Sequence, residues 1–232
     1  NYEKLSRYPA IRYYLPRYYG SVSKKDTYHG IIIEQLEFDL CSLEEKKTIL
    51  SFDQIYNLLK EIITCLKQFH KVGVCINDLK PENMMIKHET RNGKKSPRLY
   101  VIDLCLTGSK IPNSFHCHTP QFDPPHVKIN DEKCHPHNDI WNFGVICFIF
   151  FLDIKWKTLQ RNFDGNSLTD IVNNPYTGID IDNFIIASNY NQKQKIWLKK
   201  LFRGILHINE SKRWNASKSE SHFKRGTKLT TR

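Results

Sequence analysis

The stretch Ile76-Asn77-Asp78-Leu79-Lys80-Pro81-Glu82-Asn83 lies about a third of the way along the chain, and Val101-Ile102-Asp103-Leu104 follows it. In the first stretch an acid precedes a cation by two residues and an amide by five, and the second stretch adds another acid. Such a set suits phosphoryl transfer assisted by Mg²⁺. Asp78 could accept a hydroxyl proton while Lys80 faces the charge on the transferred group.

A β-hairpin is predicted between these two stretches. The short apolar runs 84–86 and 99–102 are separated by Arg91-Asn92-Gly93-Lys94, which has the Asn-Gly pair typical of a tight turn. If the strands are antiparallel, Asn83 enters the ladder at the end where Asp103 leaves it. An amide oxygen and a carboxylate can share one hard cation, so we expect both to be Mg²⁺ ligands.

The hydrophobic pattern predicts further elements on both sides of the hairpin. Residues 51–72 form the clearest helix, because Ser51 can cap it and its apolar residues recur at i, i+3, i+4 and i+7. Residues 140–152 predict a buried helix that is too short to span a bilayer. The remaining expectations are strands at 18–22 and 29–36, irregular loops and short helices over 155–191, a helix at 197–208 and a basic, frayed tail at 212–232.

Composition limits the class of protein. The 232 residues are 40% hydrophobic, which is enough for a substantial core in one or two domains. Lysine and arginine outnumber aspartate and glutamate by 35 to 24, which favours acidic partners, although a solvated basic surface explains it equally well. Seven cysteines without paired short spacings favour reduced thiols in an intracellular compartment, cytoplasmic or nuclear. No signal-peptide pattern is present, and the opening on Asn1 suggests a fragment or a processed product.

The motifs resemble those of eukaryotic-type protein kinases. Residues 78–83 are similar to the catalytic loop of the serine/threonine members, and Ile102-Asp103-Leu104 is similar to the metal-binding motif. Later landmarks of the family follow in order: Thr119-Pro120-Gln121-Phe122-Asp123-Pro124-Pro125-His126, Asp139-Ile140-Trp141-Asn142-Phe143-Gly144-Val145 and Lys212-Arg213-Trp214-Asn215-Ala216-Ser217. Because these blocks cover most of the chain in the family's order, the chain is identified as a member of this family.

The resemblance implies an α+β fold of the protein-kinase type, mainly the α-helical C-terminal lobe with a remnant β-strand part of the N-terminal lobe. It assigns residues 1–36 to the last strands of the N-terminal lobe up to the hinge, residues 37–222 to the C-terminal lobe and residues 223–232 to a basic tail. The family's glycine-rich loop, strand lysine and paired helix glutamate do not precede Tyr8-Pro9. Either the chain is truncated or it lacks half of its nucleotide clamp.

The resemblance also implies a site for ATP and Mg²⁺. Asp78 would be the catalytic base, Lys80 would stabilise the γ-phosphate, and Thr119 would bond to both. The metal ligands would be Asn83 and Asp103. The nucleotide-binding set would comprise Ile33 as gatekeeper, Glu34 and Leu36 at the adenine, Asp39 near the ribose, Met85 and Asp103.

The implied activity is transfer of a phosphoryl group from ATP to serine or threonine hydroxyls of proteins. The expected partners are therefore a nucleotide and a protein substrate. We expect neither insertion into a membrane nor binding to nucleic acid. Asp139 is expected to anchor the backbone of the catalytic loop and to do no chemistry itself.

Several positions depart from the family pattern. Ile76-Asn77 stands where the family has His-Arg, so activity is not expected to depend on phosphorylation of Thr107, Ser109 or Ser114. Cys105 replaces a glycine and should stiffen the segment. His126 replaces the glutamate that pairs with the closing arginine, here Arg213.

These departures leave two alternatives open. One is a catalytically impaired pseudokinase that acts as a binding or scaffold module. The other concerns a structural zinc site formed by His116-Cys117-His118 with Cys134-His135-Pro136-His137, although this spacing matches no recognised zinc finger.

Overall fold

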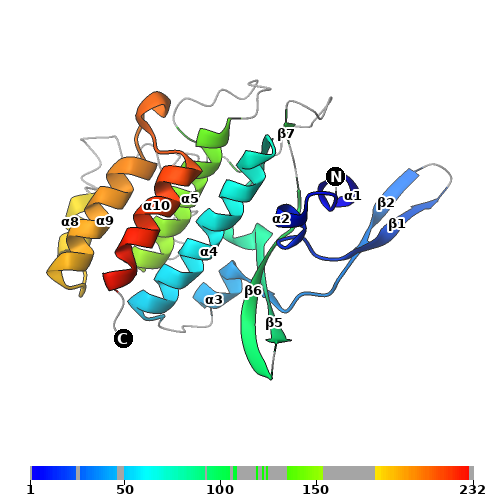
Figure 1. Cartoon of the computed structure of the whole chain (residues 1–232), viewed down its shortest axis with the longest axis horizontal. Helices are drawn as coiled ribbons and strands as arrows, with labels where there is room; N and C mark the ends of the chain where they lie inside the picture. Colours follow the sequence, from blue (N-terminus) through cyan, green and yellow to red (C-terminus); the bar gives the residue numbers. More distant parts are fainter. Residues whose placement is uncertain are drawn as a thin grey trace. The chain divides into compact units, whose positions relative to one another are not determined.

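The computed structural model describes residues 2–24, 27–45, 50–91, 93–104, 107–108, 119, 122, 124, 135–153 and 181–229. The chain divides into two compact units. The first, called the strand unit, comprises residues 1–46 and 81–104, and the second, the helical unit, comprises residues 47–80 and 105–232. Helices and small antiparallel sheets are both present, so the predicted α+β class is confirmed (Figure 1).

The strand unit contains two small sheets. β1 (Tyr18–Lys24) pairs with β2 (Thr27–Ile33), and β3 (Phe38–Asp39), β5 (Met84–Arg91) and β6 (Lys94–Val101) form a three-stranded sheet in the order β3-β5-β6. The predicted strands at 18–22 and 29–36 are thus confirmed, although β2 ends at Ile33. The other elements of this unit are α1 (Tyr2–Leu5), α2 (Pro9–Arg12), α3 (Leu40–Glu45) and the 3₁₀ turn η1 (Pro81–Asn83).

The predicted hairpin is confirmed as β5–β6. Its register runs from Met84 opposite Val101 to Arg91 opposite Lys94. Gly93 has φ +74°, a conformation that glycine adopts without a steric penalty. The Ile102 N–H donates to the Asn83 carbonyl over 3.0 Å, which extends the pairing past the last residues of the two strands. Asn83 and Asp103 therefore flank the same end of the ladder.

The helical unit is built around α4 (Phe52–Lys71) and α5 (Pro136–Leu152). Ser51 and Gln54 form a reciprocal capping box at the start of α4, as the sequence predicts for Ser51. Residues 139–151 of α5 are all buried, which confirms the predicted buried helix. Figure 1 shows α4, α5, α9 (Gln192–Ile205) and α10 (Ala216–Arg225) running alongside one another. The unit also contains β4 (Val74–Cys75), β7 (Thr107–Gly108), α8 (Ile181–Ala187), η3 (Glu210–Lys212) and η4 (Gly226–Leu229).

Two expectations for the C-terminal part need correction. α9 begins at Gln192 rather than at 197, because Asn191 and Gln194 form a second capping box. The frayed tail is wrong for residues 216–229, which form α10 and η4. The physical reason is Phe223, which is fully buried and has its ring centroid 5.4 Å from that of Tyr56 and 5.1 Å from that of Trp197.

The cysteines and the hydropathy of the helices give two further findings. Cys41, Cys65 and Cys147 are free thiols as expected, whereas Cys75 is disulfide-bonded, contrary to the expectation of reduced thiols. Burial raises the pKa of the Cys65 and Cys147 thiols well above its ordinary value, so both stay protonated. Within the described part of the chain, no helix combines the length and apolar character needed to cross a bilayer.

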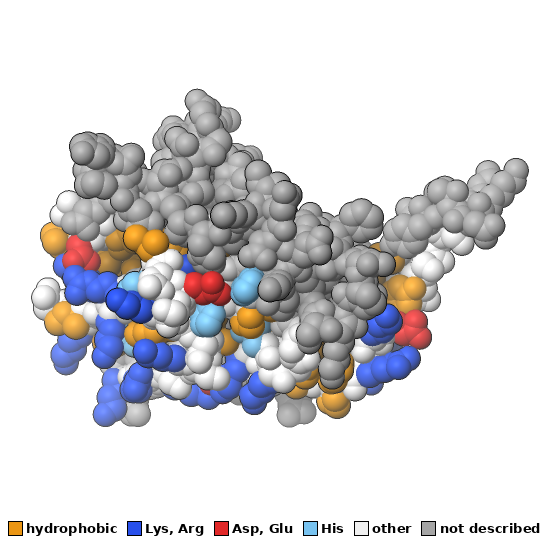
Figure 2. Space-filling view, turned by 90° about the horizontal axis from the view of Figure 1, so that it is seen from above, with side chains coloured by type: hydrophobic (Ala, Val, Ile, Leu, Met, Phe, Trp, Pro, Cys, Tyr) orange, Lys and Arg blue, Asp and Glu red, His pale blue; other side chains and the backbone are white. Residues whose placement is uncertain are grey.

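Positive charge is concentrated in the C-terminal helices. Residues 181–229 contain eleven lysines and arginines but three acidic residues, within a chain of formal net charge +11. Figure 2 shows Lys and Arg side chains gathered along one edge of the helical unit. On α9 and α10 the apolar residues other than Ile196 are buried, and the lysines and arginines lie at exposed or partly exposed positions.

Candidate active site

Three side chains of the helical unit form a closed triangle of hydrogen bonds. The Lys80 ammonium donates to Asp78 Oδ2 over 2.7 Å and to Thr119 Oγ1 over 3.0 Å. Thr119 Oγ1 donates to Asp78 Oδ1 over 2.7 Å. Asp78 is 6% exposed, so its carboxylate is held in a defined orientation with a cation beside it. The structure thus brings together three of the predicted catalytic residues, although Thr119 is far from the other two in sequence.

A tight turn shapes the loop that carries Asp78. After α4 the chain turns at Gly73, which has φ +74°, and passes through β4. The Asp78 N–H then donates back to the Ile76 carbonyl over 2.8 Å. Asn77 between them has φ 60°, in the left-handed region that asparagine tolerates better than most residues.

Asp139 fastens this turn to α5. Its Oδ2 accepts from the Ile76 N–H over 2.9 Å, and its Oδ1 accepts from the Asn77 N–H over 2.8 Å. The His70 ring Nε2 lies 2.8 Å from Oδ2. Because Asp139 is fully buried, these contacts replace its hydration shell, and the expectation that it anchors the loop backbone is confirmed.

A second residue of α5 holds the segment that carries Thr119. The Phe122 N–H donates to the Thr119 carbonyl over 2.8 Å, and Asn142 Nδ2 donates to the Phe122 carbonyl over 3.0 Å. Phe122 is fully buried and Asn142 is 2% exposed. The sequence analysis missed this role of Asn142 because the polar residue lies within an apolar run.

The predicted metal ligands lie in the strand unit. Asn83 ends η1 and is 5% exposed, whereas Asp103 follows β6 and is exposed. Asp103 has φ 49°, another left-handed conformation of a residue other than glycine. An amide and a carboxylate at one end of a ladder supply the hard oxygen ligands that Mg²⁺ prefers, so these residues fit that ion.

The predicted nucleotide-binding residues also belong to the strand unit. Asp39 of β3 is paired with Met85 of β5, so these two residues are neighbours across strands. Asp39 directly precedes α3, and its Oδ1 accepts from the Ser42 N–H in the first turn of that helix over 2.7 Å. Ile33 is the last residue of β2 and is paired with Tyr18, and the Glu34 N–H donates to the Arg17 carbonyl over 2.8 Å. Leu36 lies between β2 and β3 and is half-buried.

Comparison with known proteins identifies the family. The model of the protein kinase domain matches residues 12–223. The chain belongs to the protein kinase domain family. The expected membership in the eukaryotic-type family is therefore confirmed. The matched range contains the Asp78–Lys80–Thr119 triangle and the end of the hairpin that carries Asn83 and Asp103.

Individual relatives are similar to the kinase domain at low identity. A probable myosin light chain kinase of Dictyostelium discoideum is 25% identical over 72% of this chain and 40% of its own length. Myosin light chain kinase A of the same organism is 23% identical over 72% of this chain and 52% of its own. Calcium-dependent protein kinase 5 of Plasmodium berghei is 27% identical over 73% of this chain and 28% of its own. The chain thus spans about half or less of the length of these relatives.

The closing arginine of the kinase domain binds carbonyl groups. Arg213 is 3% exposed and donates to the His207 carbonyl over 3.0 Å and to the His137 carbonyl over 2.9 Å. Its guanidinium also lies 5.0 Å from the centroid of the Trp141 ring. Burial lowers the pKa of Arg213 to about 10, which still leaves it charged at neutral pH. His126, with which it was compared, lies outside the described residues.

Several predicted features fall on parts of the chain that the structure does not describe. They are the side chain of Thr107 and residues Cys105, Ser109, Ser114, His116, Cys117, His118 and Cys134. Of the zinc candidates, the His135 and His137 Nδ1 atoms lie 3.4 Å and 3.6 Å from Glu210 Oε1. Among the residues that are described, no group of three or more His, Cys, Asp or Glu side chains is placed to hold a metal ion.

Proposed function

We propose that this kinase domain transfers the γ-phosphoryl group of ATP to serine or threonine hydroxyls of a protein substrate. The observation that carries the proposal is the hydrogen-bonded triangle of Asp78, Lys80 and Thr119. The names of relatives support the choice of acceptor, since one of them is called a probable serine/threonine-protein kinase. An intracellular location belongs to the same proposal.

In this mechanism Asp78 orients the acceptor hydroxyl and accepts its proton. Lys80 supplies positive charge next to Asp78, where it can stabilise the transferred phosphoryl group. Thr119 keeps the two ionic side chains in register by donating to one and accepting from the other. Their orientation is fixed before substrate arrives, so little reorganisation is needed during the reaction.

The ligands of Mg²⁺ would be Asn83 and Asp103. The site of ATP would be lined by Ile33, Glu34, Leu36, Asp39 and Met85. Bound Mg²⁺ would neutralise the phosphate charge of ATP. The contribution of the protein is the hairpin, whose backbone pairing places Asn83 and Asp103 at the same end of the ladder.

The direct test is transfer of labelled phosphate from ATP to a mixture of serine- and threonine-containing peptides in the presence of Mg²⁺. We expect Asp78→Asn and Asp103→Ala to abolish transfer. Asp182→Asn is the matched control, because Asp182 is a half-buried acid of α8 that pairs with Arg203 over 2.9 Å. Transfer that survives in both Asp78→Asn and Asp103→Ala would reject the proposal.

A second candidate, a pseudokinase that binds nucleotide or partners without turnover, is favoured by one feature. Asn77 occupies the place of the family's arginine and has a left-handed backbone conformation. The two candidates separate when ADP binding and phosphate transfer are measured on the same preparation. Binding that Asp103→Ala weakens, together with no transfer by the unmodified chain, would establish the pseudokinase.

A further inference from the structure

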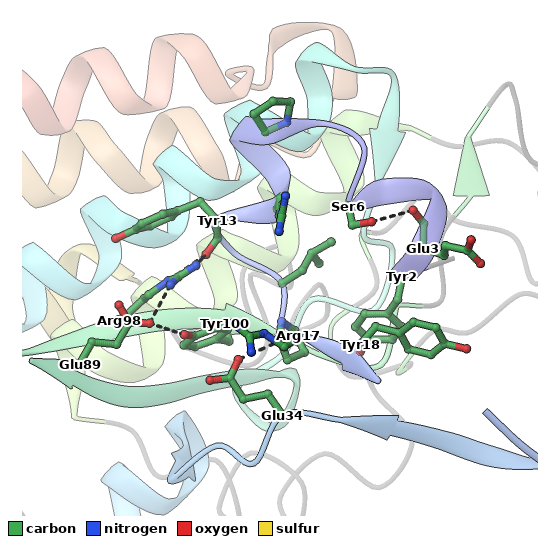
Figure 3. Close-up of a pocket in the computed structure, with 14 residues that line it drawn as sticks. Tyr2, Glu3, Ser6, Tyr13, Arg17, Tyr18, Glu34, Glu89, Arg98 and Tyr100 are labelled. Atoms are coloured by element: carbon green, nitrogen blue, oxygen red, sulfur yellow. Dashed lines mark hydrogen bonds and ion pairs between the residues drawn. The ribbon is translucent and has the colours of Figure 1, made fainter. Parts of the chain in front are cut away.

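The strand unit contains a cavity of about 720 Å³, and Glu34 is the one lining residue that it shares with the residues proposed to bind ATP and Mg²⁺. Its walls come from the segment that includes α1 and α2, from the residues around the start of β1 and the end of β2, and from β5 and β6. A volume of this size falls within the range of sites for small organic molecules. Figure 3 shows that charged and aromatic side chains from these elements converge on it.

At one end of the cavity the charges are already balanced. The Arg98 guanidinium lies 4.2 Å from the centroid of the Tyr13 ring and 4.7 Å from that of Tyr100. Arg98 Nη1 donates to Glu89 Oε1 over 2.7 Å, and the Tyr100 hydroxyl donates to the same oxygen over 2.6 Å. The charges of Glu89 and Arg98 therefore neutralise each other, and we do not expect either side chain to determine which ligand binds.

Glu34, in the middle of the cavity wall, is also neutralised. Its Oε1 accepts from the Lys87 ammonium, and its Oε2 accepts from the Arg17 N–H over 3.2 Å. Burial alone would raise the pKa of Glu34, but the hydrogen bonds from Lys87 and Arg17 outweigh it and hold the pKa below its ordinary value. Glu34 stays ionised near neutral pH, with its negative charge matched by Lys87.

Two cations of the same wall remain available. Arg12 and Arg17 line the cavity, and both are exposed. Within the described part of the chain, neither guanidinium takes part in a hydrogen bond or an ion pair. The remaining acid of the lining, Glu3, lies at the opposite end from Arg98 (Figure 3). The cavity thus offers two guanidinium groups to an anion.

Aromatic surface lies beside these cations. Tyr18 follows Arg17 directly, and its ring is stacked on that of Tyr2 with centroids 6.4 Å apart and an interplanar angle of 8°. Both tyrosines line the cavity. We propose that the cavity binds a small aryl phosphate, with the phosphate held by Arg12 and Arg17 and the ring packed against the tyrosines. Two guanidinium groups match the charge and the hydrogen-bonding oxygens of a phosphate monoester.

Titration calorimetry with phenyl phosphate, on the whole chain, tests this site. We expect saturable binding, and about tenfold weaker binding for both Arg12→Ala and Arg17→Ala, since a hydrogen bond to a charged group contributes about that factor. Arg7→Ala is the matched control, because Arg7 is an exposed arginine of the same segment that does not line the cavity. Arg7→Ala should bind like the unmodified chain.

The Tyr18→Leu variant tests the contact with the ligand's ring separately from the contact with its phosphate group. We expect this variant to weaken phenyl phosphate several-fold but to leave the weaker binding of inorganic phosphate unchanged. Thermal unfolding of each variant verifies that it is folded. Phenol and inorganic phosphate should both bind more weakly than phenyl phosphate, because phenol lacks the phosphate group and inorganic phosphate lacks the aromatic ring.

The outcomes that would overturn the proposal are distinct from failure of the kinase proposal. The site would be rejected if no saturable binding is found, or if the Arg12→Ala and Arg17→Ala variants bind phenyl phosphate as tightly as the unmodified chain does. Phenol that binds as tightly as phenyl phosphate would also reject it. Displacement of phenyl phosphate by ADP would assign the binding to the nucleotide site instead, and would also reject it. If the chain transfers no phosphate at all, the binding of phenyl phosphate to the unmodified chain and to the two arginine variants still tests this cavity.

Discussion

Thr119 acts as both donor and acceptor, and this double role explains why a neutral hydroxyl lies between two charged groups. Its hydroxyl donates a hydrogen bond to Asp78 and accepts one from Lys80. A side chain without a hydroxyl would leave one oxygen of a carboxylate that is only 6% exposed without this partner. The cost of such a loss is about 1–3 kcal/mol.

Thr119→Ala is therefore expected to lower the rate of phosphate transfer by about 10- to 100-fold, because Asp78 and Lys80 lose their common partner. Thr119→Ser keeps the hydroxyl and should retain most of the rate. The measurement is kcat for both variants with one peptide substrate. A rate of Thr119→Ala equal to that of Thr119→Ser would contradict the role of the hydroxyl.

His222 makes stability depend on pH. It is 4% exposed, its ring is stacked on Trp197 with centroids 4.8 Å apart, and burial lowers its pKa to about 4. Between that value and the ordinary histidine pKa near 6.5, the unfolded chain binds more protons than the folded chain. Folding stability therefore falls as the pH is lowered through this window, and its loss below pH 4 amounts to at most about 3 kcal/mol.

His222→Gln should remove this part of the pH dependence, since glutamine can still donate to the Trp197 carbonyl that His222 Nε2 contacts over 3.2 Å. The drop in Tm between pH 7 and pH 4.5 is expected to be smaller for the variant than for the unmodified chain. Equal drops in Tm would show that His222 does not titrate as its burial implies.

At the scale of elements, α5 holds both loops that carry the Asp78–Lys80–Thr119 triangle. Asp139 holds the turn before Asp78, and Asn142, less than one helical turn further on, holds the segment after Thr119. Helical geometry places residues three apart on the same face, so one rigid and buried helix fixes two loops at once.

Asp139→Asn tests this role of α5. The amide group can accept only through its oxygen, so at least one contact from the turn or from His70 is lost, and we expect destabilisation by about 1–3 kcal/mol together with slower phosphate transfer. Asp153→Asn is the control, because Asp153 is an exposed aspartate at the end of the same helix in a left-handed conformation that asparagine tolerates. Denaturant unfolding measures the difference, and equal stability of the two variants would contradict the anchoring role.

At the scale of the whole molecule, the two units differ in how much apolar surface they bury. The helical unit buries α5 almost completely together with the apolar faces of α4, α9 and α10. The β1–β2 hairpin of the strand unit leaves large side chains exposed, among them Tyr19 at 60%, Val22 at 49% and Ile32 at 49%. A two-stranded sheet with so little burial contributes little stability of its own.

Native-state hydrogen exchange should reveal this difference. We expect the amides of α4 and α5 to exchange most slowly, near the rate set by global unfolding, and those of β1 and β2 to exchange at least about 100-fold faster. Mass spectrometry of peptide fragments after exchange gives both rates in one experiment. Protection of β1 and β2 equal to that of α5 would show that the hairpin unfolds only with the core.

Local sequence alone determined the elements that carry the candidate site. The Asn-Gly pair at 92–93 predicts the β5–β6 turn, Ser51 predicts the start of α4, and the apolar run at 140–152 predicts a buried helix, because turn, capping and burial preferences act over a few neighbouring residues. The same reasoning failed for α10, whose short polar sequence becomes a helix through the packing of Phe223.

The tertiary structure alone decided which distant groups meet. Asp139 reaches the Ile76 N–H from 63 residues away, Thr119 reaches Asp78 from 41 residues away, and Arg213 finds carbonyl groups, none of which has a periodic signal in the sequence. Such contacts depend on how buried polar groups replace their lost hydration, and that is settled only when helices pack. The stretch from Ile76 to Asn83 therefore carries the side chains of the proposed chemistry, while packing around α5 decided how Asp78 and Lys80 are oriented.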